Sequence, residues 1–144
     1  MRPPQDHTTE FPFPETIELR PIAIMRSPYK ERFATPHQAT TVRGTRDGDL
    51  REGRIELLPH LPIEVLRDLD GFEYVWALYL FHMNPGWGPL VRPPRGPKRK
   101  RGVLATRSPH RPNPVGLSAL RLVGVEGRFV IVRGIDILDG TTML

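Results

Sequence analysis

Short strand-like segments separated by turn residues dominate this chain, and this pattern limits its fold more than any other feature. The 144 residues include 17 prolines and 13 glycines, which supply frequent turn signals. The segments between them are rich in aromatic and β-branched residues, which favour strands. Consecutive short strands of this kind predict a mainly β fold, a small antiparallel barrel with long loops between its strands.

Six segments are predicted as strands, and one as a short helix. The helix is expected at 62–71, where Ile63, Leu66 and Leu69 recur at helical spacing, a proline opens the segment and Gly71 ends it. A tight turn is expected at Glu126-Gly127. The strands are expected at 16–27, 54–58, 72–83, 102–106, 115–125 and 129–138.

The totals indicate one cytoplasmic domain. Residues 1–15 are polar, proline-rich and without a period, so we expect a disordered tail followed by a single domain over 16–144. The chain has no cysteine, which excludes disulfides and thiolate metal sites. The N-terminus lacks the apolar region of a signal peptide, and the longest apolar run, 75–81, is too short to span a bilayer.

Positive charge gathers in one part of the chain. The formal net charge is +5, and no acidic residue lies between Glu73 and Glu126. A solvated basic loop is one reading of this interval. Contact with nucleic acid is the favoured reading, because no carboxylate is available locally to pair with these cations. The basic residues of the interval are Arg92, Arg95, Lys98, Arg99, Lys100, Arg101, Arg107, Arg111 and Arg121.

The stretch ATRSPHRPNPVGLS, residues 105–118, is the most unusual loop in the sequence. It places arginines, a histidine and an asparagine among three prolines, which fix the backbone around Arg111 and Asn113. A loop stiffened in this way loses less entropy when it binds a ligand. The same prolines would also make a rigid crossing between two strands, and the residues alone leave both readings open.

Common catalytic signatures are missing. No G-x-G-x-x-G motif or Walker A motif is present, so neither a Rossmann nucleotide site nor a P-loop is indicated. The five histidines are scattered without partners at metal-ligand spacing, and we expect no metal. A triad of Ser108, His110 and Asp136 can be drawn on paper, but such a set can be drawn in most chains of this size.

Four segments together resemble one family. IAIMRSPYKERFATPHQ, LDGFEYVWALYLFH, VRPPR with GVLATRSPHRPNPVGLS, and GIDILDGT are similar to the TsaA/YaeB (TrmO-like) family of tRNA (N6-threonylcarbamoyladenosine-37-N6)-methyltransferases, over about residues 17–142. The resemblance implies a small β-barrel that binds S-adenosylmethionine without a Rossmann fold. It also implies a homodimer with the cofactor site near the interface, and methyl transfer to N6 of the modified adenosine t6A at position 37 of the tRNA anticodon loop.

The resemblance also assigns residues. Many members have an arginine where this chain has His37, and many continue past the LDGT segment, so we expect this chain to be truncated at its C-terminal end. The cofactor residues carried over are His37, Gln38, Ala39, His82, Met83, Arg107, Leu117, Arg133, Gly134, Ile135 and Asp136. The residues expected around the tRNA substrate are Tyr29, Lys30, Arg95, Lys98, Arg99, Lys100, Arg101 and Arg111.

Methyl transfer from a sulfonium is an in-line displacement, and most of its acceleration comes from alignment of the reacting atoms. Asn113 is the candidate for orienting the N6 proton of t6A, as a hypothesis. Arg107, Arg111 and the run from Arg95 to Arg101 can bind the threonyl carboxylate and the phosphates. Tyr29 and Trp87 are candidates to stack on bases. Two alternatives stay open, namely a barrel that binds S-adenosylmethionine or RNA without catalysis and a methyltransferase for another substrate.

Overall fold

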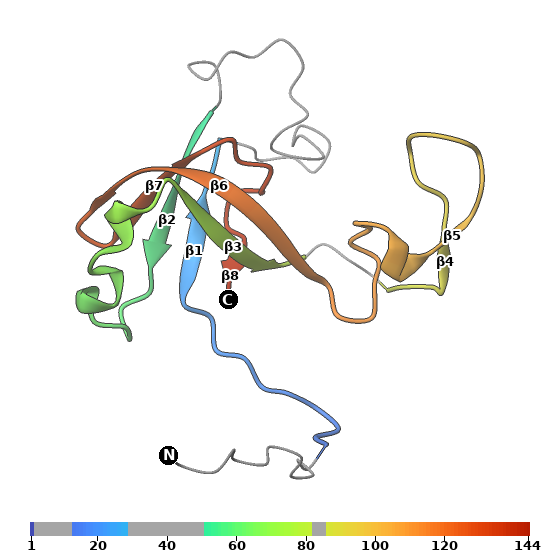
Figure 1. The fold of residues 1–144 in the computed structure, drawn as a ribbon, viewed down its shortest axis with the longest axis horizontal. Helices are drawn as coiled ribbons and strands as arrows, with labels where there is room; N and C mark the ends of the chain where they lie inside the picture. The colour runs from blue at the N-terminus through green and yellow to red at the C-terminus, as the bar shows by residue number, and fades with distance from the viewer. Residues whose placement is uncertain (2–12, 29–50, 82–85) are drawn as a thin grey trace.

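The chain forms a closed antiparallel β-barrel (Figure 1). The computed structural model describes residues 1, 13–28, 51–81 and 86–144. Around the barrel the strands follow the order β1–β2–β7–β6–β3–β8, which confirms the prediction of a mainly β barrel. These strands are β1 (Ala23–Arg26), β2 (Glu52–Leu57), β3 (Tyr74–Leu80), β6 (Val115–Glu126), β7 (Phe129–Arg133) and β8 (Thr142–Met143).

The longest strand, β6, forms the wall that carries the candidate site. It pairs with β3 from Val115, opposite Leu80, to Arg121, opposite Tyr74. Its far half pairs with β7 across the predicted turn, where Gly127 has a φ of 57° that favours glycine. The short strand β8 pairs with both β1 and β3 and so closes the barrel.

The barrel interior is an apolar core to which most strands contribute. Met25, Leu120 and Val132 are fully buried, and alternate residues of β3 point to opposite sides of its wall. Ala77 and Tyr79 face inward, whereas Trp76 and Leu78 are exposed. The predicted strand 72–83 is thus present, and its alternating residues form an inner and an outer face.

A separate two-stranded hairpin stands out from the barrel (Figure 1). It consists of β4 (Leu90–Val91) and β5 (Arg101–Gly102), and we call residues 90–102 the arm. The arm contains six of the nine basic residues of this interval, and their side chains are exposed. Within the described part of the chain, no helix is long and apolar enough to cross a membrane.

The strand predicted at 102–106 is wrong. Val103–Ala105 forms a 3₁₀ turn, η5. Both the backbone N–H and the hydroxyl of Thr106 donate to the Val103 carbonyl, at 3.2 and 2.8 Å, and this local bonding competes with a strand ladder. The apolar residues of this segment favour a strand, but the threonine that follows them closes a turn instead.

Other predicted elements are present with different bounds. The helical segment 62–71 consists of two 3₁₀ turns, η3 (Ile63–Leu66) and η4 (Leu69–Gly71), because Asp68 between them adopts a left-handed conformation with φ 66°. The strand expected over 129–138 ends at Arg133, since Gly134 turns the chain with φ 73°. Within 16–27, only β1 is strand.

Candidate functional site

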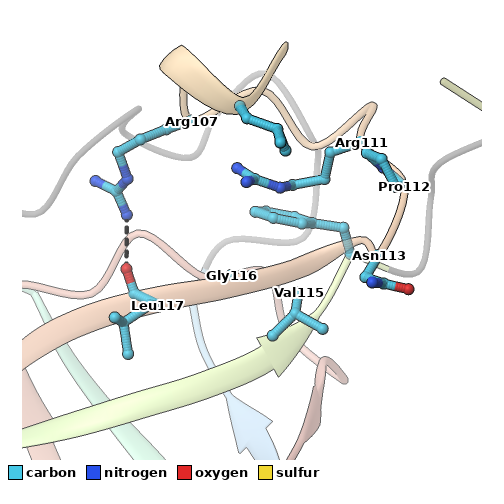
Figure 2. A pocket seen from close by; sticks show the side chains of 9 residues that line it. Arg107, Arg111, Pro112, Asn113, Val115, Gly116 and Leu117 are labelled. Atoms are coloured by element: carbon cyan, nitrogen blue, oxygen red, sulfur yellow. Dashed lines mark hydrogen bonds between the residues drawn. The ribbon is translucent and has the colours of Figure 1, made fainter. Parts of the chain in front are cut away.

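A pocket of about 440 Å³ lies between the loop 104–113 and the beginning of β6 (Figure 2). Its volume lies within the range of pockets that bind small molecules. Apolar and cationic side chains line it together, and the cations come from the loop that the sequence singled out. The lining residues are Phe81, Leu104, Arg107, Arg111, Pro112, Asn113, Val115, Gly116 and Leu117.

Two predicted cofactor residues meet in this pocket. The Arg107 Nη2 donates a hydrogen bond of 2.8 Å to the backbone oxygen of Leu117 (Figure 2). A backbone carbonyl carries no net charge, so it orients a guanidinium without neutralising the guanidinium's charge. Arg107 is therefore held against β6 while its positive charge stays available to an anionic or polar ligand.

The loop before the pocket is stiffened by its own side chains. The Thr106 hydroxyl accepts from the backbone N–H of Ser108, and the Ser108 hydroxyl accepts from that of His110, both at 3.2 Å. The Arg111 Nη1 donates to the Thr106 carbonyl at 3.1 Å. The Nδ1 of His110 lies 3.2 Å from the Gly86 carbonyl. The sequence leaves two readings of this stretch open, a preorganised binding loop and a rigid crossing between strands. The structure favours the binding loop, because the stiff loop forms one wall of the pocket.

The cations beside the pocket differ in their partners from the arginines on the barrel strands. In the described ranges, neither Arg107 nor Arg111 takes part in an ion pair, and none of the arm's basic residues does. On the barrel, in contrast, Arg54 lies 3.1 Å from Glu126 and Arg121 lies 3.5 Å from Glu73. Positive charge is therefore uncompensated by carboxylates on one side of the molecule.

Asp136 reaches the same neighbourhood from the segment after β7. The Ser118 hydroxyl, on β6 next to Leu117, donates a hydrogen bond of 2.9 Å to the Asp136 Oδ1. The Tyr79 hydroxyl lies 3.1 Å from the Ser118 Oγ. Burial raises the pKa of the Tyr79 phenol, the Asp136 charge raises it further, and Arg107 acts in the opposite direction. The charges of Asp136 and Arg107 thus shift the pKa of the same buried phenol in opposite directions.

The other predicted cofactor residues after β7 lie differently. The Arg133 Nε lies 3.8 Å from the Glu52 carboxylate, in a partly exposed pair. Gly134 makes the turn after β7. The Ile135 side chain is buried in the core, with only 2 % of its surface exposed. Ile135 therefore presents almost no surface to a ligand.

The predicted substrate residues fall into two groups. Arg111 and Asn113 line the pocket, but Figure 2 shows the Asn113 amide at the end away from Arg107, while the Arg111 guanidinium points toward the Arg107 side. Trp87 is exposed just before the arm. Arg95, Lys98, Arg99, Lys100 and Arg101 lie on the arm, away from the pocket lining.

Some predicted residues lie outside the described part of the chain. These are Tyr29, Lys30, His37, Gln38, Ala39, His82 and Met83. Among the residues that are described, no group of three or more histidine and carboxylate side chains could hold a metal ion.

Sequence reasoning missed Tyr79, Ser118 and Phe81. Tyr79 and Ser118 read as ordinary members of alternating strands, and only their polar atoms at inward positions could have drawn attention to them. Phe81 lies 5.4 Å from Tyr79, ring centre to ring centre, in an edge-to-face arrangement, and it forms part of the pocket. Its role is set by the pairing of β3 with β6, which the sequence does not specify.

Comparison with known proteins adds a family to this geometry. The model of the tRNA-methyltransferase O N-terminal domain matches residues 24–144. A tRNA (adenine(37)-N6)-methyltransferase of Escherichia coli is 36 % identical, covering 90 % of this chain and 56 % of that protein. A probable S-adenosyl-L-methionine-binding protein of Pyrococcus abyssi is 40 % identical, covering 91 % of this chain and 67 % of that protein.

Solved structures agree with this family. The crystal structure of TrmO from Pseudomonas aeruginosa superposes with a TM-score of 0.68 at 37 % identity, covering 94 % of this chain and 55 % of that one. The chain thus spans little more than half the length of the Escherichia coli and Pseudomonas aeruginosa proteins.

Proposed function

The chain belongs to the family of the tRNA-methyltransferase O N-terminal domain, and from this membership and the pocket beside β6 we propose that it is an S-adenosylmethionine-dependent tRNA methyltransferase. The proposed acceptor is N6 of adenine 37, the position in the name of the Escherichia coli relative. The finer proposal, which rests on the sequence resemblance, is that this adenine carries the threonylcarbamoyl group of t6A. Such an enzyme would act in the cytoplasm.

One observation carries this proposal. Arg107 and Arg111 flank an apolar pocket, and each is oriented by a backbone carbonyl instead of being neutralised by a carboxylate. A ligand with a planar base, polar groups and a carboxylate matches this lining, because the base contacts apolar surface and the carboxylate binds a guanidinium. S-adenosylmethionine and the t6A nucleoside each have a planar base, polar groups and a carboxylate.

The proposed cofactor residues are those that the described structure brings together around β6. Arg107 and Leu117 form one edge of the pocket, and Asp136 is joined to β6 through Ser118. When bound, S-adenosylmethionine supplies the methyl group. The protein's part is to hold the cofactor and the base in line and to keep water out, since alignment provides most of the acceleration.

The arm is proposed to bind the RNA backbone. Its cations are exposed, have no ion pairs among the described residues, and stand away from the barrel (Figure 1). Cations of this kind bind phosphates and release counterions, which makes the binding depend on salt. Arg111, between the arm and β6, is proposed to bind the substrate side of the pocket.

A homodimer remains a proposal that rests on the sequence resemblance. It is supported by exposed apolar side chains on the outer faces of β3 and β6, with Trp76 72 %, Leu78 44 % and Leu117 49 % exposed. Exposed apolar patches often mark interfaces. A second copy on this face would adjoin the pocket, because Leu117 belongs to both. Sedimentation of wild type and Trp76→Glu tests this, with a dimer and a monomer expected; two identical sedimentation profiles would contradict it.

The experiment that tests the function is methyl transfer to two tRNA preparations that differ only in t6A. The protein is incubated with labelled S-adenosylmethionine and each preparation, and the modified nucleosides are separated by mass spectrometry. Product from the t6A preparation alone supports the full proposal. Product from both preparations retains the methyltransferase and removes the t6A requirement. Cofactor binding without product from either indicates a binding module, the alternative reading.

A further inference from the structure

Three polar side chains form a hydrogen-bonded chain through the end of the barrel. It runs from the Tyr79 hydroxyl to the Ser118 Oγ, 3.1 Å apart, and from there to the Asp136 Oδ1 at 2.9 Å. Tyr79 and Ser118 are each only 5 % exposed. Polar groups buried to this degree are costly unless they are bonded, so the chain holds its members in defined orientations.

The number of hydroxyl hydrogens determines which residue donates in each of these hydrogen bonds. Ser118 has a single hydroxyl hydrogen, and it is donated to the Asp136 carboxylate. The Ser118 oxygen is then an acceptor toward Tyr79, so the phenol must be the donor. Because burial raises the pKa of Tyr79, the phenol keeps its proton at neutral pH and can always donate.

The sequence of β6 makes room for this arrangement. Tyr79 lies opposite Gly116 in the β3–β6 ladder, and a Cβ atom at Gly116 would lie 2.4 Å from the Tyr79 ring. Without that atom, the ring lies across β6 and its hydroxyl reaches Ser118, two residues further along the strand. Gly116 also lines the pocket, so the chain begins directly behind the pocket wall.

Asp136 is the one member of the three that is partly exposed. We propose that Tyr79 and Ser118 are positioning residues that orient the Asp136 carboxylate toward bound S-adenosylmethionine, where it accepts hydrogen bonds from a hydroxyl or ammonium group. This inference rests on the proposed function, in which Asp136 binds the cofactor. A side chain held in place by bonded neighbours binds its ligand with a smaller entropy cost.

The test is calorimetric titration of S-adenosylmethionine into the 144-residue protein and four variants. Asp136→Asn, which removes the charge, is expected to weaken binding about 30-fold, and Ser118→Ala about tenfold. Tyr79→Phe, which keeps the ring, is expected to weaken it about threefold. Tyr74→Phe is the matched control, since this tyrosine lies on the same strand with 54 % of its surface exposed, and its affinity should equal wild type.

Two further readouts separate positioning from a general loss of structure. Tyr79→Phe added to Ser118→Ala should cause no further loss of affinity, because the chain is already broken. In protein with ¹³C-labelled tyrosine, the Tyr79 pKa should fall in Asp136→Asn, which loses a charge that raises it. All variants should bind tRNA like wild type.

The outcomes distinguish the two proposals. If Asp136→Asn binds the cofactor like wild type, both the cofactor role of Asp136 and the positioning role of its neighbours are wrong. If Asp136→Asn is weakened while Ser118→Ala and Tyr79→Phe bind like wild type, the positioning role alone is wrong. Should Ser118→Ala fail to fold, as judged by thermal unfolding, the nearly isosteric Tyr79→Phe decides the matter by its affinity.

Discussion

The arginines beside the two halves of β6 have different kinds of partner. At its far half, Arg54 pairs with Glu126 and Arg121 pairs with Glu73, so each positive charge has a carboxylate beside it. Beside its first half, in the loop 104–113, Arg107 bonds to the carbonyl of Leu117 on β6, and Arg111 bonds to that of Thr106 within the loop. A carboxylate neutralises an arginine, whereas a carbonyl only orients it. The arginines beside the first half are therefore available to an external anion, whereas the paired arginines beside the second half are not.

The same contrast extends to packing. Gly116, near the start of β6, lies against the Tyr79 ring, whereas Gly124, near its end, has nothing within 4 Å of the position of a Cβ atom. The pocket end is thus tightly constrained by a buried polar chain, and the far end tolerates changes. The difference teaches that residues of one type on one strand carry different weight, according to what their neighbours supply.

The largest expected effect concerns tRNA binding by the arm. Replacing Arg99, Lys100 and Arg101 by glutamine should weaken tRNA binding by about 30-fold or more and reduce its salt dependence by about two to three counterions. The matched control replaces the paired arginines Arg26, Arg54 and Arg121 by glutamine, which removes the same charge from the barrel. Filter binding of tRNA over a range of salt concentrations measures the affinity and its salt dependence for both triple variants. Equal losses in the two triple variants would show that only net charge matters.

The next effect concerns stability. Gly116→Ala should lower the free energy of unfolding by about 2 kcal/mol, because the new Cβ atom would lie 2.4 Å from the Tyr79 ring. Gly124→Ala should be neutral or stabilise the protein by up to about 1 kcal/mol, since nothing crowds that position and alanine restricts the unfolded chain. Urea unfolding gives both values. Equal effects at the two glycines would contradict the difference between the halves of the strand.

A smaller effect is expected for cofactor binding at Arg107. Arg107→Met keeps most of the side-chain volume and removes the guanidinium, and it should weaken S-adenosylmethionine binding about tenfold, or about 1.4 kcal/mol. Arg54→Met removes an arginine that is paired with Glu126 and should leave the affinity unchanged. Calorimetry compares the two variants. Unchanged affinity in Arg107→Met would remove this residue from the cofactor site.

The smallest expected effect concerns pH. Burial raises the pKa of Tyr79 above its usual value of 10.0, so the folded protein keeps the phenol proton where the unfolded chain loses it. This contribution is fully present below pH 10 and is lost as the pH rises through the raised pKa of the folded state. Wild type should therefore lose stability as the pH rises above about 10, and Tyr79→Phe should lose less. Urea unfolding at a series of pH values measures this difference. Parallel curves of unfolding free energy against pH for the two proteins would contradict this role of Tyr79.

The sequence predicted the fold best where strand-forming residues and turn signals agree. The strands β3 and β6 and the turn at Gly127 follow from residues that fit a half-buried strand or a positive φ. It failed at Val103–Ala105, where the Thr106 side chain captures a carbonyl and closes a 3₁₀ turn. Such a competition between local bonds and a ladder depends on pairing partners that the sequence does not name.

The candidate site was predicted only in part. The resemblance named Arg107, Leu117 and Asp136, and the structure brings them to one end of β6. Tyr79 and Ser118 were not named, because their role arises from the register that sets Tyr79 opposite Gly116. A motif identifies residues near each other in the chain, whereas a hydrogen-bonded path across strands requires the register of the sheet.

We expect the first half of β6, and not the second, to hold the cofactor. Titrating S-adenosylmethionine into ¹⁵N-labelled protein and following the amide signals tests it most directly. We predict saturable shifts at Arg107, Gly116 and Leu117, with Gly124 and Glu126 unmoved. Shifts at the far half of the strand, or none at millimolar cofactor, would contradict the account.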